Sequence, residues 1–195
     1  MRKKLSTGFV VGFGGIVLFA TMGPAIDGVT QALRAEYSPT IQPTIDHEVA
    51  MVFIGSPQCE FSTSAEVRTA VRALKREVVR TAREAEAEVR LVGVSVNSDP
   101  TEGVEFLSRF GQFDEITAGG FFANSAAQRY IYGDMPGVAA TPQIVLIDRR
   151  ADSDGPLGTF GEVVLARLSG APSIINAVAE GLLTRRILMG TGDVP

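Results

Sequence analysis

The chain contains three apolar runs of strand length, separated by segments in which apolar residues recur at helical spacing. The runs cover residues 49–54, 89–96 and 143–148. Continuous apolar runs of this length predict strands that are buried on both faces of one sheet. The segment after the first run predicts a long helix over residues 63–86. Its apolar face would hold Val67, Val71, Leu74 and Val78.

Turn and cap residues divide the rest of the chain into shorter elements. The sequence Asn97-Ser98-Asp99-Pro100 predicts a turn and then a helix that ends near Phe110. An edge strand is expected over residues 160–168 and a closing helix over 172–188. Strands that alternate with helices in this way predict an α/β domain.

The N-terminus has the pattern of a membrane segment. Three basic residues follow Met1, and residues 5–26 carry no charge, which is enough chain to cross a bilayer at about 20 residues. A cleaved signal peptide is the alternative, with Gly23 and Ala25 before the cut. We expect an anchor over residues 1–26, a connector over 27–48, a globular domain over 49–188 and a tail over 189–195. Because the basic residues would stay in the cytoplasm, the domain would be periplasmic or extracytoplasmic, on a single-pass protein of the inner membrane.

Three glycines in this segment share one face of the predicted membrane helix. Gly8, Gly12 and Gly15 are spaced at i, i+4 and i+7, and small residues at this spacing let a second membrane helix pack closely. Glycine is also generally common in membrane helices. The spacing nevertheless favours one or more integral-membrane partners bound through this helix.

Composition excludes several classes of function. The chain of 195 residues has a formal net charge of −4 and no basic stripe with interleaved aromatics, so we expect no nucleic-acid partner. It contains one cysteine and one histidine, His47, which leaves no ligand set for a structural zinc ion. We expect no metal and no cofactor, and we interpret His47 as a surface residue. The aromatics Phe121, Phe122, Tyr130 and Tyr132 are interpreted as packing residues.

The single cysteine, Cys59, is the candidate reactive group. It lies between the first predicted strand and the first predicted helix. Unpaired backbone N–H groups and the helix dipole at such a junction stabilise a thiolate and lower the pKa of its thiol. Glu60 and the apolar neighbours of Cys59 would oppose that effect.

Residues 56–62, with the sequence Ser-Pro-Gln-Cys-Glu-Phe-Ser, resemble the active site of membrane-anchored thiol:disulfide interchange proteins of the thioredoxin-like superfamily. Those proteins have Ser-Pro-x-Cys-x-x-Cys, so Ser62 stands where the second cysteine is expected. Residues 140–148, with Thr141-Pro142 before a strand, are similar to the family's segment in which a cis proline faces the active cysteine. The resemblance implies a thioredoxin-like fold, a central mixed sheet flanked by helices, with Cys59, Ser62 and Pro142 at its site. It also implies a strand within residues 113–124 and a further helix over residues 125–132.

The loss of the second cysteine leaves two hypotheses. A dithiol enzyme releases a mixed disulfide with its second cysteine, which Ser62 cannot do. The first hypothesis, which we expect, is a non-catalytic accessory subunit of a larger respiratory or photosynthetic membrane complex, with a degenerate site. The second is a monothiol thiol-disulfide oxidoreductase or thiol-binding protein, which the retained Cys59 favours.

A peroxidase would need an arginine near the cysteine, for which Arg129 is the only loosely placed candidate.

Overall fold

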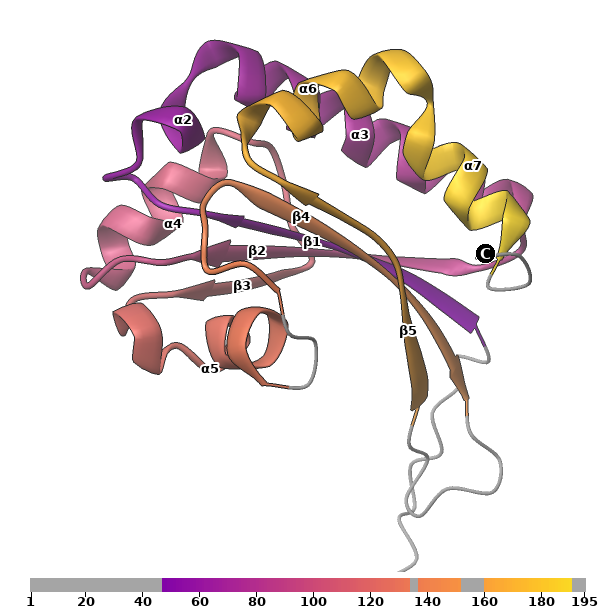
Figure 1. The fold of residues 1–195 in the computed structure, drawn as a ribbon. Helices are drawn as coiled ribbons and strands as arrows, with labels where there is room; N and C mark the ends of the chain where they lie inside the picture. The colour runs from indigo at the N-terminus through magenta and orange to yellow at the C-terminus, as the bar shows by residue number, and fades with distance from the viewer. Residues whose placement is uncertain (1–46, 134–136, 152–159, 191–195) are drawn as a thin grey trace, which may run out of the picture. The chain divides into compact units, whose positions relative to one another are not determined.

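The computed structural model describes residues 47–133, 137–151 and 160–190, without the side chains of Phe122 and Phe160. These residues form one five-stranded sheet with helices on both faces (Figure 1). The strands are β1 (His47–Gly55), β2 (Glu88–Ser95), β3 (Glu115–Ala118), β4 (Gln143–Ala151) and β5 (Phe160–Ser169). The helices are α2 (Glu60–Thr63), α3 (Ala65–Glu84), α4 (Pro100–Ser108), η1 (Phe121–Ala123), α5 (Ser125–Ala127), η2 (Gln128–Tyr132), α6 (Ala171–Glu180) and α7 (Leu182–Met189).

The strand order is β3-β2-β1-β4-β5, with β1 at the centre. β1 runs parallel to β2 and antiparallel to β4, β2 runs parallel to β3, and β4 runs antiparallel to β5. The predicted sheet is confirmed, since the three apolar runs form its three central strands. β1 begins at His47, two residues before the predicted start.

The continuous apolar sequence of β1 follows from burial on both faces of the sheet. Val49, Met51 and Phe53 face α3, α4, α6 and α7, whereas the alternate residues Ala50 and Val52 face α5 and η2. Because neighbouring side chains of a strand point to opposite faces, a strand covered on both sides has no solvent face to mark with polar residues. Figure 1 shows the helices above and below the sheet.

Two predicted helices differ in the structure. The helix expected over residues 63–86 begins at Ala65, after the separate turn α2, because the backbone of Ser64 is extended with ψ of 148° and its hydroxyl accepts a hydrogen bond from the N–H of Val67. The closing helix is interrupted at Gly181, which adopts the left-handed conformation at φ of 55°. An N-cap and a left-handed glycine are ordinary ends for a helix, and both signals were present in the sequence.

Several predictions concern residues that lie outside the described ranges. They are the membrane segment with Gly8, Gly12 and Gly15, most of the connector, and the tail beyond Gly190. Within the ranges that are described, no helix combines the length and the apolar character needed to cross a membrane.

Candidate functional site

Cys59 lies directly after the central strand, where β1 leaves the sheet. Its backbone N–H donates to the carbonyl of Ser56 at 3.1 Å and forms a tight turn. It is the N-cap of α2, and its own carbonyl accepts from the N–H of Thr63 at 3.1 Å. The residue therefore sits at a strand-to-helix junction, as predicted, but the helix that follows it is one turn long and α3 begins separately at Ala65.

The antiparallel pairing of β1 with β4 brings Thr141 and Pro142 to the cysteine. Ile54, near the end of β1, pairs with Gln143 at the start of β4. The segment just before β4 thus meets the segment just after β1. The Sγ of Cys59 lies 3.3 Å from the carbonyl oxygen of Thr141 and donates a hydrogen bond to it. The bond between Thr141 and Pro142 is cis, as predicted.

The pKa of Cys59 lies below its ordinary value as the result of opposing effects. Partial burial is the largest single effect and raises the pKa of the thiol. Hydrogen bonds from the Ser62 and Thr141 side chains and from the backbone N–H groups of Ser62 and Phe61 stabilise the thiolate and together outweigh burial. Three of these four donors, the Ser62 hydroxyl and the N–H groups of Ser62 and Phe61, belong to the single turn α2. These local hydrogen bonds, more than the dipole of a long helix, account for the lowered pKa.

Ser62 is the fully buried member of this group. Its side chain is 0% exposed, and among the described residues its hydroxyl has no partner with ordinary hydrogen-bond geometry. The same hydroxyl nevertheless lowers the pKa of Cys59 by bonding to its sulfur when the thiol is ionised.

A cavity of about 270 Å³ opens beside the cysteine sulfur. Its lining residues are Ser56, Gln58, Cys59, Val96, Phe121, Ile131, Tyr132, Ala139, Ala140 and Thr141. Phe121 and Tyr132 are 47% and 41% exposed, so these two aromatic side chains, interpreted from the sequence as packing residues, form part of an accessible rim. No sequence signal linked them to Cys59, because the contact depends on how η1 and η2 fold back over the end of the sheet.

Arg129 does not take the place that a peroxidase would require. Its Nη2 lies 2.6 Å from the Oε2 of Glu162, in an ion pair with β5. The lining of the cavity beside Cys59 includes no arginine among the residues that the structure describes. The observed arrangement therefore gives no support to peroxide chemistry at Cys59.

His47 is part of β1 and not an isolated surface residue. Its Nε2 lies 2.5 Å from the Oδ1 of Asp148 on the neighbouring strand β4. The side chain is 26% exposed and its partner carboxylate is buried. No cluster of three or more histidine, cysteine, aspartate or glutamate side chains suited to a metal ion occurs within the described ranges.

The arrangement of these elements is that of a thioredoxin-like fold. A mixed five-stranded sheet is flanked by helices, a cysteine follows the central strand, and a cis proline precedes the adjacent antiparallel strand. The resemblance inferred from residues 56–62 and 140–148 is therefore confirmed at the level of the fold.

Comparisons with known proteins find similarity only among solved structures. No model of a protein family matches the chain, and no curated protein matches it. A secreted disulfide oxidoreductase of Mycobacterium tuberculosis, homologous to E. coli DsbE, is 20% identical over 73% of this chain and 81% of its own, with a TM-score of 0.37. A thioredoxin-like protein of Porphyromonas gingivalis is 13% identical over 75% of this chain and 79% of its own, with a TM-score of 0.39.

A third structure comes from Chlorobium tepidum and is described as a thiol:disulfide interchange protein, DsbE. It is 15% identical over 72% of this chain and 80% of its own, with a TM-score of 0.40. At these identities each structure is a neighbour of the chain in fold only.

Proposed function

We propose that the protein is a monothiol thioredoxin-like protein that forms mixed disulfides through Cys59. This proposal rests on the environment of the Cys59 sulfur. Cys59 lines a cavity, and its Sγ lies 3.3 Å from the carbonyl oxygen of Thr141. The pKa of Cys59 is lowered because hydrogen bonds to the thiolate outweigh the effect of burial. A thiolate of this kind is the attacking species in thiol-disulfide exchange.

The exchange step needs no oxidant beyond the partner's own disulfide. The Cys59 thiolate attacks one sulfur of that disulfide, a new sulfur–sulfur bond forms, and the other sulfur leaves as a thiolate with the electron pair. Because the chain has a single cysteine, an external thiolate must attack the mixed disulfide to restore Cys59. The partner is therefore held covalently until a second thiol arrives, which suits capture of a partner protein as well as turnover.

The accessory-subunit hypothesis is retained as the second candidate function. It is favoured by the absence of a second cysteine and by the glycine spacing at Gly8, Gly12 and Gly15. In this proposal the segment 5–26 anchors the protein in the inner membrane and packs against an integral-membrane partner, while the thioredoxin-like domain is periplasmic. Cys59 would then be dispensable.

One experiment distinguishes the two candidates. Cells that express the full-length protein are acid-quenched and alkylated, and mixed disulfides are separated on non-reducing gels. We expect covalent adducts with the wild-type protein that disappear in Cys59→Ala and on reduction. An absence of adducts, with a Cys59→Ala variant that still co-purifies with the same membrane proteins, would refute the monothiol function and leave the accessory role.

The membrane proposal has its own test, since it depends on residues far from Cys59. Gly12→Leu should release the protein from a detergent-solubilised assembly, because a leucine side chain blocks close helix approach. Val17→Leu is the control, since it also places a leucine in the segment but on the opposite face of the predicted helix. Wild-type protein that purifies without any partner would refute the accessory role, and a mature chain that starts at Ile26 would remove the anchor.

A further inference from the structure

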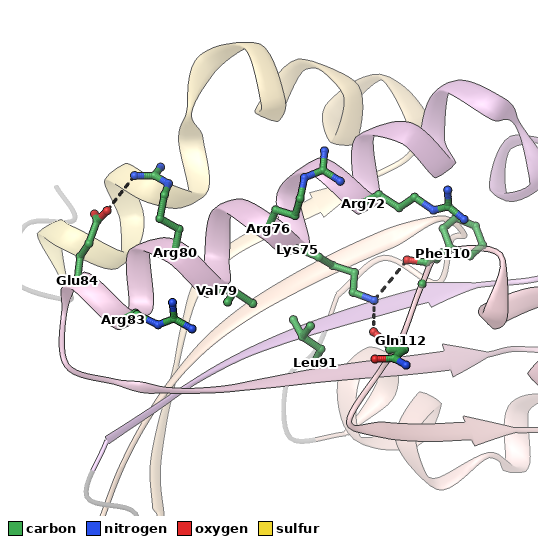
Figure 2. Close-up of a pocket in the computed structure, with 11 residues that line it drawn as sticks. Arg72, Lys75, Arg76, Val79, Arg80, Arg83, Glu84, Leu91, Phe110 and Gln112 are labelled. Carbon is green, nitrogen blue, oxygen red and sulfur yellow. Dashed lines mark hydrogen bonds and ion pairs between the residues drawn. The ribbon is translucent and has the colours of Figure 1, made fainter.

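A second and larger cavity lies on α3, with no lining residue in common with the cavity beside Cys59. It measures about 580 Å³, within the range of roughly 300–1,000 Å³ that is usual for small-molecule sites. One wall is the exposed side of α3, and the other is formed by Leu91 on β2 and by residues 110–112, which follow α4. Figure 2 shows Lys75 of α3 extending toward Phe110 and Gln112, whereas Arg76 and Arg80 extend away from Leu91.

The rim of the groove is strongly basic. Five cationic side chains of α3 line it, namely Arg72, Lys75, Arg76, Arg80 and Arg83. The only carboxylate in the lining is that of Glu84, whose Oε1 lies 3.0 Å from the Nη1 of Arg80. A single carboxylate balances only one of the five positive charges. The groove therefore carries an excess of positive charge, on a chain with a formal net charge of −4.

Some of these cationic side chains already have hydrogen-bond partners within the protein, and others have no carboxylate partner among the described residues. The Nη2 of Arg72 donates to the carbonyl of Arg109 at 2.5 Å, and the Nζ of Lys75 donates to the carbonyls of Phe110 and Gln112. These two side chains hold the far wall of the groove against α3. Arg76 and Arg83 are exposed and have no carboxylate partner within the described part of the chain. Their guanidinium groups remain available to a ligand.

The floor of the groove is apolar. It is formed by Val79 on α3, Leu91 on β2 and the edge of Phe110, and Figure 2 shows Val79 and Leu91 extending toward one another. The methylene stems of the arginines extend this apolar surface while their charged ends stay in water. A free phosphate ion would pair with the cationic side chains of the rim and leave the apolar floor exposed to water. A neutral lipid would cover the apolar floor and leave the cationic side chains without an anionic partner.

We propose that this groove binds a small amphiphilic anion, an organic molecule with a phosphate or carboxylate head and an alkyl body. The head would pair with the guanidinium group of Arg76 or of Arg83, because planar guanidinium groups match the oxygens of phosphate and carboxylate in bidentate fashion. The alkyl body would cover Val79 and Leu91. The site is independent of Cys59 and of the exchange chemistry proposed for it.

The test is a calorimetric titration of the full-length protein with hexyl phosphate, which is water-soluble, alongside inorganic phosphate and hexanol. We expect saturable binding of one hexyl phosphate, at least tenfold tighter than either inorganic phosphate or hexanol. Added salt should weaken it, because part of the attraction is between charges at the surface. Cys59→Ala should bind hexyl phosphate as the wild-type protein does.

Matched variants connect the binding to the groove. Arg76→Glu with Arg83→Glu should weaken hexyl phosphate binding at least tenfold. Arg185→Glu with Arg186→Glu makes the same change of net charge on exposed residues of α7, outside the groove, and should stay within twofold of wild type. Val79→Ser should lower the affinity for hexyl phosphate and leave the affinity for inorganic phosphate unchanged. All variants should keep the wild-type circular dichroism spectrum.

Four results would overturn the proposal. The first is an absence of saturable binding, which would make the basic face of α3 a solvated helix surface. The second is equal affinity for inorganic phosphate and hexyl phosphate, and the third is equal loss of binding in the two double variants. The fourth is binding only to vesicles of anionic phospholipid and not to hexyl phosphate, which would make the groove part of a membrane-contacting surface.

Discussion

In the interior of the domain, the Nη1 of Arg149 lies 2.7 Å from the Oε1 of Glu48, and both side chains are buried. Glu48 on β1 also accepts from the Nε of Arg90 on β2 at 2.7 Å. Arg149 on β4 extends the network to the hydroxyl of Tyr130 at 3.2 Å and to the carboxylate of Glu162 on β5 at 2.7 Å. Charged side chains from four strands thus form one network of ion pairs, in which Glu48 and Arg149 are buried and Arg90 is partly exposed.

We expect Glu48→Ala to destabilise the domain strongly. The substitution would remove one of the two carboxylates that lie 2.7 Å from the buried guanidinium of Arg149 and leave only that of Glu162. Removal of one partner of a buried ion pair costs about 3–5 kcal/mol. The measurement is the free energy of unfolding from urea denaturation. Arg80→Ala, which removes an exposed ion pair with Glu84, is the control and should cost no more than about 1 kcal/mol. Equal losses in the two variants would contradict a stabilising network.

Removal of the Ser62 hydroxyl should raise the pKa of Cys59. Ser62→Ala takes away the side-chain hydrogen bond to the thiolate while burial of the sulfur, which raises the pKa, remains. The measurement is the rate of alkylation by iodoacetamide against pH, which follows the thiolate fraction. Its midpoint should move to higher pH in Ser62→Ala. Thr63→Ala is the control, because the Thr63 hydroxyl donates to the carbonyl of Glu60 instead. An unchanged midpoint in Ser62→Ala would remove Ser62 from the site.

Restoration of the second cysteine should convert the protein to a dithiol. In Ser62→Cys the new thiol would lie one helical turn from Cys59, where it could attack a mixed disulfide and release the partner. We expect covalent adducts to become scarce in cells and catalytic reduction of insulin by dithiothreitol to appear. The double variant Cys59→Ala with Ser62→Cys should lack the catalytic reduction of insulin, and adducts through Cys59 should be absent from it, as in Cys59→Ala alone. Adducts that persist in Ser62→Cys at the wild-type level would mean that position 62 cannot reach the mixed disulfide.

The sequence revealed the parts of the fold that depend on local patterns. The buried strands were visible because burial on both faces leaves uninterrupted apolar runs, and Thr141-Pro142 was visible through its resemblance to a known segment. The pairing of Glu48 with Arg149 was missed because the two residues are 101 positions apart and meet only when β1 pairs with β4. The groove on α3 was missed for a related reason. Helical spacing identifies the basic face, but not the loop of residues 110–112 that turns it into a cavity.

Lys75 should make stability depend on pH in the alkaline range. Burial lowers the pKa of its ammonium group from 10.5 to about 8, with Asp114 opposing the change and Arg72 adding to it. Between these pH values the unfolded chain binds a proton at Lys75 that the folded chain does not, so folding stability rises with pH. The contribution is fully present above the unfolded pKa and is lost as the pH falls through about 8.

The dependence can be isolated by comparison with Lys75→Met. This variant also loses the hydrogen bonds from Nζ to the carbonyls of Phe110 and Gln112, which lowers its stability at every pH. The urea-derived free energy of unfolding should therefore be higher for wild type, by a margin that widens between pH 7.5 and pH 10 by no more than about 3 kcal/mol. Titration of other groups affects both proteins equally and cancels in the difference. A margin that stays constant or narrows would show that Lys75 is solvated in the folded protein, and that its contacts with Phe110 and Gln112 do not hold it out of water.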